Sequence, residues 1–243
     1  MKLELDNKII HFKDVESTNL CAKKYVENNK VDLPVVFTTD FQTNGRGYPP
    51  NIWDSEKGKN LLISIALNSS INLSEIFNLN IITSLSLIDL LEDFNISNLS
   101  IKWPNDILIR KRKVCGILIE NKIKRKDIVF SIIGAGLNVN QIKFPDFERK
   151  ATSIFNETNK VNKIEGVMEK FLRKMENRLQ NSSERNKEDY LSKLYLRDKV
   201  SVFLINNVKQ NGIIKSVDSG GKLLIELENV IQSFDLKEVK FLY

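Results

Sequence analysis

The run at residues 61–67, LLISIAL, constrains the fold more than any other feature of the chain. All of its residues except Ser64 are apolar. A strand that is apolar on both faces is typical of the centre of a sheet, because it is covered from both sides. We therefore predict that residues 61–67 form a central strand of a sheet.

Shorter patterns on either side predict the other elements. Apolar runs bounded by polar or turn residues indicate strands, and apolar residues at helical spacing indicate helices. Ser17 or Thr18 is a plausible N-cap for the first helix, and Ser74 for the second. The expected strands are 8–13, 35–39, 61–67 and 127–133 with a strand, break and hairpin over 100–120, and the expected helices are 19–29, one that follows Ser74, 161–180 and 184–194.

The pattern of the chain changes after Leu196. Short apolar runs follow one another there, separated by Asn-Asn, Asp-Ser-Gly-Gly and Glu-Asn. Short strands with such turns are typical of a small antiparallel barrel. We predict two domains, residues 1–195 and residues 196–243.

Composition indicates a globular protein of ordinary type. The hydrophobic fraction is 42% and the charged fraction 28%, which is enough for a sizeable core. No apolar run approaches the roughly 18 residues of a membrane span, and residues 1–14 lack the apolar core of a signal peptide. We therefore expect a cytoplasmic protein that has no membrane partner.

The supply of cysteine and histidine limits the chemistry. The chain has Cys21, Cys115 and one histidine, His11, and it has no CxxC pair. A zinc site of Cys and His ligands is therefore not expected, and no metal site is predicted. We interpret His11 as part of an edge strand. The net charge of +6 and the pI of about 9.1 favour an acidic partner, a nucleic acid or a phosphorylated ligand, without deciding among them.

Four polar segments interrupt the apolar strands: ESTN (16–19), QTNGRG (42–47), KWPND (102–106) and GAGLNVN (134–140). Each lies at the end of a predicted element, where binding groups usually lie. Their occurrence together in one chain indicates a shared site.

These segments, in this order, resemble those of biotin protein ligases. The hairpin return KVCGILIE, ATSI at 151–154 and the C-terminal barrel agree with the same family. The resemblance implies an α+β fold in which helices pack on a mixed sheet. This is the class II synthetase-like biotin/lipoate ligase catalytic domain, and a small SH3-like barrel follows it. It implies an ATP-dependent ligase that activates biotin as biotinyl-AMP and transfers it to a specific lysine of a biotin carboxyl carrier domain. The partner is then the carrier protein or domain of a biotin-dependent carboxylase, Mg²⁺ is held mainly through ATP, and the protein is a monomer or a homodimer.

The resemblance also implies roles for single residues. Arg46 and Lys102 are the expected catalytic residues, because a carboxylate that attacks a phosphate needs cations to neutralise both groups. The residues expected at biotin are Ser17, Thr18, Asn19, Gln42, Gly45, Arg46, Gly47, Lys102, Gly134 and Gly136. The residues expected at ATP or the adenylate are Trp53, Asn105, Lys113 and Asn138.

Each role has a simpler alternative. Arg46 could be a turn arginine on the surface, Lys102 an exposed strand residue and Lys113 a turn cation. Trp53 could only anchor its loop, and Asn138 could only cap a turn. We favour the binding roles for these residues, because they belong to motifs that occur together in one chain.

The glycine loop departs from the family pattern. Family members often have further arginines and a third glycine here, whereas this chain has Tyr48, Pro49, Pro50 and Asn51. Arg46 is left as the only cation of the loop, which bears on how tightly the adenylate is retained. We expect residues 42–52 to act as a lid, mobile without ligand and ordered over it.

Two other functions are compatible with parts of the sequence. A lipoate or octanoate protein ligase has a related fold, although KWPND and the glycine loop with its downstream Trp53 favour biotin. A nucleic-acid-binding protein would use the +6 charge, but the basic residues are spread along the chain. The segment before Ser17 is too short for a helix-turn-helix domain. We therefore expect the monofunctional type of ligase, without the DNA-binding domain and without specific DNA binding.

Overall fold

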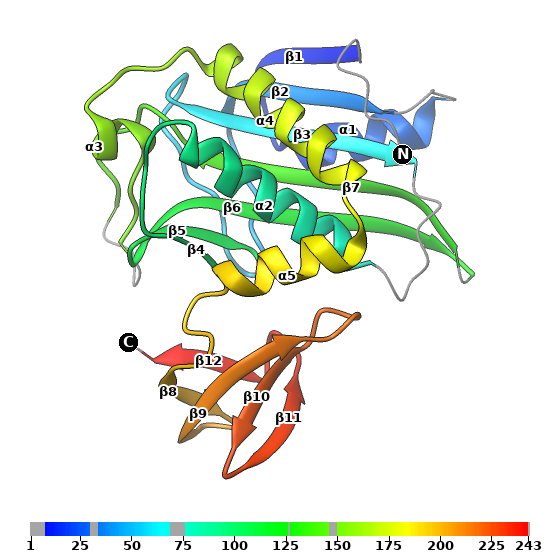
Figure 1. The fold of residues 1–243 in the computed structure, drawn as a ribbon. Coiled ribbons are helices and arrows are strands. Elements are labelled where there is room, and N and C mark those ends of the chain that lie inside the picture. Colours follow the sequence, from blue (N-terminus) through cyan, green and yellow to red (C-terminus); the bar gives the residue numbers. More distant parts are fainter. Residues whose placement is uncertain (1–7, 30–33, 69–75, 126, 146–149, 243) are drawn as a thin grey trace.

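The computed structural model describes residues 8–29, 34–68, 76–125, 127–145 and 150–242 (Figure 1). Its larger sheet has seven strands in the order β1-β2-β3-β7-β6-β5-β4. The strands are β1 (Lys8–Val15), β2 (Val35–Gln42), β3 (Asn60–Asn68), β4 (Leu99–Lys102), β5 (Asp106–Ile109), β6 (Arg112–Lys124) and β7 (Asp127–Asn138). The β1–β2 pair is parallel and the other neighbours are antiparallel, so the sheet is mixed, as predicted.

Strand β3 lies inside the sheet, between β2 and β7. The side chains of residues 61–67 are all at most 1% exposed, which confirms the central strand expected from LLISIAL. Ser64 shares this burial, and its hydroxyl is hydrogen-bonded to the side chains of Thr18 and Asn19 in the first helix. At the edge of the sheet, β1 carries His11, which lies 3.4 Å from a carboxylate oxygen of Asp40.

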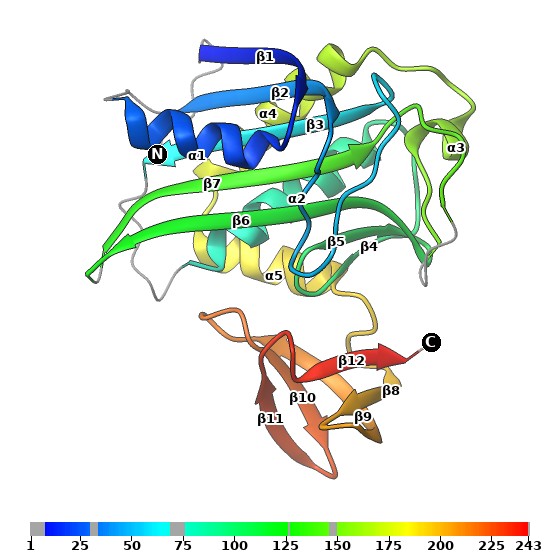
Figure 2. The same cartoon turned by 180° about the vertical axis from the view of Figure 1, so that it is seen from behind.

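Helices cover both faces of this sheet. Figure 1 shows α2 (Asn78–Glu92), α4 (Ile164–Gln180) and α5 (Ser183–Lys193) on one face, and Figure 2 shows α1 (Thr18–Asn28) on the other. The short helix α3 (Ile154–Thr158) follows the ATSI segment. The sequence did not predict α3, and the bounds predicted for the other helices agree with the structure to within three residues. The predicted cap Ser74 lies outside the described residues, and α2 follows Phe77.

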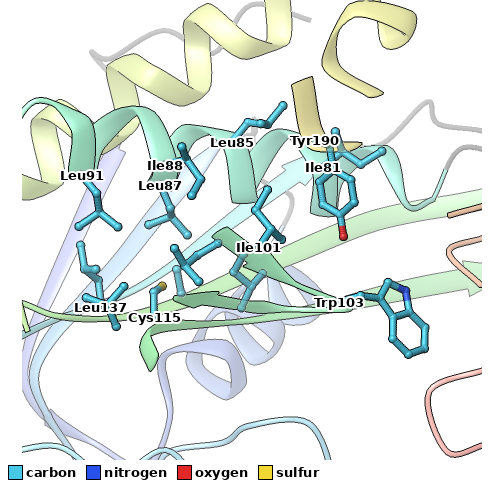
Figure 3. Packing of buried hydrophobic residues seen from close by; sticks show 14 of the residues in the cluster. Ile81, Leu85, Leu87, Ile88, Leu91, Ile101, Trp103, Cys115, Leu137 and Tyr190 are labelled. Carbon is cyan, nitrogen blue, oxygen red and sulfur yellow. The ribbon is translucent and has the colours of Figure 1, made fainter. Parts of the chain in front are cut away.

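The helix layer on the α2 face encloses the main core. Leu87 and Leu91 point from α2 towards the sheet, where Leu137 and Cys115 lie, whereas Leu85 points away from the sheet (Figure 3). Apolar residues on one face of the helix thus meet the corresponding face of the sheet. The opposite face of the sheet has a smaller core under α1: Ala22, Val35, Phe37, Ala66, Phe130 and Ile132.

The C-terminal strands form a separate five-stranded antiparallel sheet, as predicted. Its order is β11-β10-β9-β8-β12. The strands are β8 (Val200–Ile205), β9 (Val208–Val217), β10 (Leu223–Leu227), β11 (Val230–Phe234) and β12 (Val239–Leu242). We call residues 200–242 the barrel.

The barrel is attached to the larger sheet by buried contacts. The indole Nε1 of Trp103 donates a 2.8 Å hydrogen bond to the carbonyl oxygen of Gly221. A Cβ at Gly221 would lie 2.6 Å from a ring carbon of Phe77, so only glycine permits this approach. One continuous apolar cluster joins the two parts. The division of the chain between residues 195 and 196 therefore stays a prediction, although the two sheets are distinct.

Candidate functional site

A cavity of about 860 Å³ lies between the α1 face of the larger sheet and the barrel. The connection between β2 and β3 crosses this face over β7 and β6 towards the barrel (Figure 2). All four polar segments singled out in the sequence contribute to the lining. The predicted site residues that line it are Ser17, Thr18, Asn19, Gln42, Arg46, Gly47, Trp53, Lys102, Asn105, Lys113, Gly134, Gly136 and Asn138.

A buried polar network forms one wall of the cavity. Ser64 Oγ lies 2.7 Å from Thr18 Oγ1 and 2.6 Å from Asn19 Oδ1. Gln42 Oε1 accepts hydrogen bonds from the backbone N–H and the hydroxyl of Thr18. Ser17 is the N-cap residue of α1, but its side chain makes no capping hydrogen bond. A purely structural cap would use its hydroxyl to bond the end of the helix. The hydroxyl of Ser17 does not, so it can bind another group.

Gly134 has a specific packing role in this wall. A Cβ at Gly134 would lie 2.2 Å from Asn19 Oδ1, so any other residue would displace Asn19. The resemblance placed Gly134 against the biotin ring, whereas its closest side-chain neighbour here is Asn19. Gly134 thus lets the start of α1 approach β7 and brings the polar network to the cavity.

Glu120, which the sequence reasoning missed, joins Arg46 to this network. Asn19 Nδ2 donates a 2.9 Å hydrogen bond to one carboxylate oxygen of Glu120, and Arg46 Nη1 lies 3.4 Å from the other. The carboxylate holds the guanidinium beside the network. Glu120 lies in the KVCGILIE segment, but nothing in the sequence pattern indicates which basic residue it meets.

The glycine loop forms a narrow hairpin over the cavity. Arg46 and Ile52 pair in an isolated antiparallel bridge, and Trp53 N–H donates to the carbonyl oxygen of Gly45 at 2.9 Å. A Cβ at Gly45 would lie 2.2 Å from the carbonyl oxygen of Trp53. Gly45 is the one predicted site residue that does not line the cavity, and its role in the structure is to close the hairpin.

The indole of Trp53 lies on a flat floor made by two glycines. Cβ atoms would lie 3.0 Å from the ring at Gly116 and 2.4 Å from it at Gly136. The buried Nε1 of Trp53 has no hydrogen-bond partner among the described residues. An aromatic ring in a slot with an unsatisfied donor is suited to a planar ligand that offers an acceptor.

Lys113 lies at the edge of this slot. Its Nζ is 2.7 Å from a carboxylate oxygen of Asp106 and 5.4 Å from the centre of the Trp53 ring. Both partners fix the position of the ammonium. Asp106 belongs to KWPND, and its function as an anchor for Lys113 was not predicted from the sequence.

The two predicted asparagines are tied to the backbone. Asn105 Nδ2 donates to the carbonyl oxygen of Ile117 at 2.8 Å, and Asn138 Nδ2 donates to that of Thr152 at 2.9 Å. These bonds hold the turn after β4 and the end of β7. The bond from Asn138 joins segments 14 residues apart along the chain and does not cap a turn. The predicted contact of Asn138 with adenine stays a prediction.

The barrel closes the remaining side of the cavity. Lys102 Nζ lies 5.1 Å from the centre of the Phe241 ring, so the larger sheet and the barrel meet at a predicted catalytic residue. Sequence reasoning placed all of the candidate ligand residues before residue 154 and missed this side. The barrel residues that line the cavity are Leu204, Asn206, Asn207, Leu236, Lys237, Glu238, Val239, Lys240 and Phe241.

The charge of the lining favours an anion. The basic residues are Arg46, Lys102, Lys113, Lys237 and Lys240, and the acidic ones are Asp54, Asp106 and Glu238. A cavity with an excess of cations concentrates anionic ligands. Thiolate chemistry is not indicated, because burial raises the pKa of the Cys115 thiol well above its ordinary value.

No group of three or more His, Cys, Asp or Glu side chains among the described residues is placed to hold a metal ion. No helix within the described ranges is long and apolar enough to span a membrane.

The fold and the site together define a class of protein in which a small barrel closes a cation-lined cavity on one face of a mixed sheet. The sequence profile of the Biotin/lipoate A/B protein ligase family matches residues 11–138. This match covers more than half of the 243 residues, and the chain belongs to this family.

Individual relatives are named as ligases. The chain is 32% identical over 148 residues to the bifunctional ligase/repressor BirA of Bacillus subtilis, covering 60% of this chain and 46% of that protein. It is 25% identical over 201 residues to the biotin–[acetyl-CoA-carboxylase] ligase of Mycobacterium tuberculosis, covering 79% of this chain and 73% of that one. The chain thus spans about half the length of the relative from Bacillus subtilis.

A solved structure is similar over almost the whole chain. The biotin protein ligase from Aquifex aeolicus in complex with biotin and ATP has a TM-score of 0.78 and 26% identity, covering 96% of this chain and 97% of that one. The biotin protein ligase from Leishmania major in complex with biotinyl-5-AMP has a TM-score of 0.67 at 18% identity, which shows a shared fold. The resemblance to biotin protein ligases and the predicted fold are confirmed.

Proposed function

We propose that this protein is a biotin–protein ligase that uses ATP to activate biotin and then transfers it to a lysine of a carrier domain. The observation that carries the proposal is the meeting of all four polar segments at one cation-lined cavity. Similarity over 96% of the chain to an enzyme solved with biotin and ATP supports the same assignment.

The first step would join biotin to AMP. A carboxylate oxygen of biotin attacks the α-phosphorus of ATP, and the bond to the β-phosphate breaks, so pyrophosphate leaves with the electron pair. Both reactants are anionic, and the step is slow unless fixed cations offset their repulsion and the charge that develops in the transition state. Arg46, Lys102 and Lys113 line the cavity and would supply these charges. Mg²⁺ would arrive with ATP and screen its phosphates.

The second step would transfer biotin to the carrier. The neutral amine of a lysine on the carrier attacks the carbonyl carbon of biotinyl-AMP, and the bond to the phosphate oxygen breaks, so AMP leaves with the electron pair. The amine loses a proton as the amide forms. The proposed partner is the carrier domain of a biotin-dependent carboxylase, a choice supported by the name of the relative from Mycobacterium tuberculosis.

The polar network of Ser17, Thr18, Asn19 and Gln42 would bind the ureido ring of biotin. A urea both donates and accepts hydrogen bonds, and hydroxyl and amide groups can satisfy both kinds of atom. Ser64 lies behind Thr18 and Asn19 and holds them in place. Buried groups of this kind reject a ligand that leaves them unpaired.

The same network favours biotin over lipoate and octanoate, the alternative substrates that we consider. A ureido ring can exchange hydrogen bonds with the hydroxyl and amide groups of this wall, whereas an alkyl chain or a dithiolane ring has no strong donor or acceptor to offer them. The +6 charge alone supports a nucleic-acid ligand, but the cations of the site lie inside a cavity of about 860 Å³. A duplex is too wide for such a cavity.

Biotin-dependent exchange of labelled pyrophosphate into ATP tests the first step. Biotin, lipoate and octanoate are compared at equal concentration with the same enzyme and Mg²⁺. We expect exchange with biotin at least tenfold faster than with either alternative. Equal exchange with lipoate would contradict the assignment to biotin, and no exchange with any of the three acids would contradict the ligase function.

A further inference from the structure

Lys102 and Phe241 come from opposite sides of the cavity and meet. Lys102 ends β4 of the larger sheet, and Phe241 lies on β12 of the barrel. The ammonium lies 5.1 Å from the centre of the ring, within the range of a cation–π contact. Phe241 is only 6% exposed, so the ring that faces Lys102 is shielded from solvent.

The core of the barrel fixes the orientation of this ring. Phe241 pairs directly with Phe203 across β12 and β8, and the two ring centres are 5.4 Å apart at an interplanar angle of 74°. Phe203 is fully buried. An edge-to-face pair with a buried partner leaves Phe241 little freedom to rotate.

The barrel itself is held next to Lys102. The residue that follows Lys102 is Trp103, whose Nε1 donates a 2.8 Å hydrogen bond to the carbonyl oxygen of Gly221 in the barrel. Gly221 in turn lies against Phe77 of the catalytic domain. The strand end that carries the cation therefore also carries the anchor of the domain that presents the ring.

We propose that Phe241 is a positioning residue that holds the Lys102 ammonium in place for the adenylation step. A lysine has a long flexible stem, and ordering it costs conformational entropy. A preoriented ring on a rigid barrel reduces that cost before the substrate binds, and preorganised charge is what stabilises a transition state. This assignment rests on the proposed function and gives the barrel a specific part in it.

The test compares two barrel phenylalanines of equal burial. Phe241 and Phe234 are both 6% exposed, but Phe234 does not line the cavity. Phe241→Leu removes the ring that faces Lys102, Phe234→Leu is the matched control, and Phe241→Tyr restores an aromatic face. The measurement is single-turnover formation of biotinyl-AMP at saturating biotin and ATP, with the melting temperature of each variant.

We expect Phe241→Leu to lower the single-turnover rate roughly fivefold or more, in keeping with a shielded cation–π contact. Phe241→Tyr should recover most of that rate, and Phe234→Leu should keep the wild-type rate at a similar melting temperature to Phe241→Leu. Equal rates for Phe241→Leu and Phe234→Leu would overturn the proposal.

A double-mutant cycle separates positioning from a general structural effect. If Phe241 acts through Lys102, then Phe241→Leu should slow the wild type but not the Lys102→Ala enzyme. The same fold-loss in both backgrounds would contradict the proposal. A wild-type enzyme that forms no biotinyl-AMP would instead contradict the proposed function, and the inference would fall with it.

Discussion

The Nζ of Lys113 lies 2.7 Å from a carboxylate oxygen of Asp106, so an acidic residue holds a basic one at the wall of the cation-lined cavity. The Lys113 side chain is 30% exposed and that of Asp106 14%. The pair is thus partly shielded from water. A charged hydrogen bond in such a place contributes more to stability than one at an open surface. Lys113 can face a phosphate while its position stays fixed.

Replacing Asp106 should therefore disturb the chemistry more than the fold. We expect Asp106→Asn to slow biotinyl-AMP formation roughly tenfold, because losing a charged hydrogen bond frees the ammonium of Lys113. Biotin affinity should change less than threefold. The matched control is Asp14→Asn, which removes a carboxylate from an exposed pair with Lys57. Single-turnover rates within twofold of one another for the two variants would contradict the role of Asp106.

Gly136 should be sensitive to the smallest substitution. A Cβ at this position would lie 2.4 Å from Trp53 Cε2, so Gly136→Ala must displace the indole from its slot. We expect ATP affinity to fall roughly tenfold if Trp53 stacks on adenine, in line with the value of base–aromatic stacking. The fluorescence of Trp53 should change as well. Gly166→Ala is the control, because nothing lies within 4 Å of its added Cβ. Unchanged ATP affinity in Gly136→Ala would remove Trp53 from the nucleotide site.

Arg178 should matter for stability and not for catalysis. Its guanidinium donates hydrogen bonds of 2.6 and 2.7 Å to Asp89 of α2 and a further one to Asp189 of α5. The hydrogen bonds that Arg178 donates to Asp89 raise the pKa of Arg178 above its ordinary value. We expect Arg178→Met to lower the free energy of unfolding by about 2 kcal/mol. Arg173→Met, on an exposed face of the same helix, is the control in denaturant titrations, and an equal effect of the two changes would contradict this account.

The glycine loop should become protected when ligands bind. Arg46 and Tyr48 lie on this loop, and both line the cavity. We expect biotin with ATP to slow tryptic cleavage after Arg46 at least fivefold, because a lid ordered over its ligand is a poor protease substrate. Cleavage after Arg125, at the exposed end of the β6–β7 hairpin, serves as the internal control. Equal slowing at both sites would indicate a general effect, and unchanged cleavage after Arg46 would contradict the lid.

The sequence was informative where chemistry and local structure coincide. Residues 61–67 predicted the central strand because burial on both faces leaves a continuous apolar run. The polar segments at 16–19, 42–47, 102–106 and 134–140 predicted one site, because each interrupts the apolar pattern at the end of a strand or helix. All of them border the same cavity.

The contacts between distant residues were not predictable in the same way. Glu120 meets Arg46 across strands, and Phe241 meets Lys102 across domains. Neither pairing has a sequence spacing that a local rule could detect, because tertiary packing alone decides it. The packing role of Gly134 was also not predictable from the sequence. Its lack of a side chain makes room for Asn19, a distant residue, and does not mark a turn.

The most direct measurement of the central claim is the intact mass of a biotin carboxyl carrier domain after incubation with this protein, ATP, Mg²⁺ and biotin. The account predicts that the carrier gains the mass of one biotin, less one water, on a single lysine, and that the gain requires ATP. A carrier whose mass stays unchanged, or one that gains lipoate in preference to biotin when both are present, would contradict it.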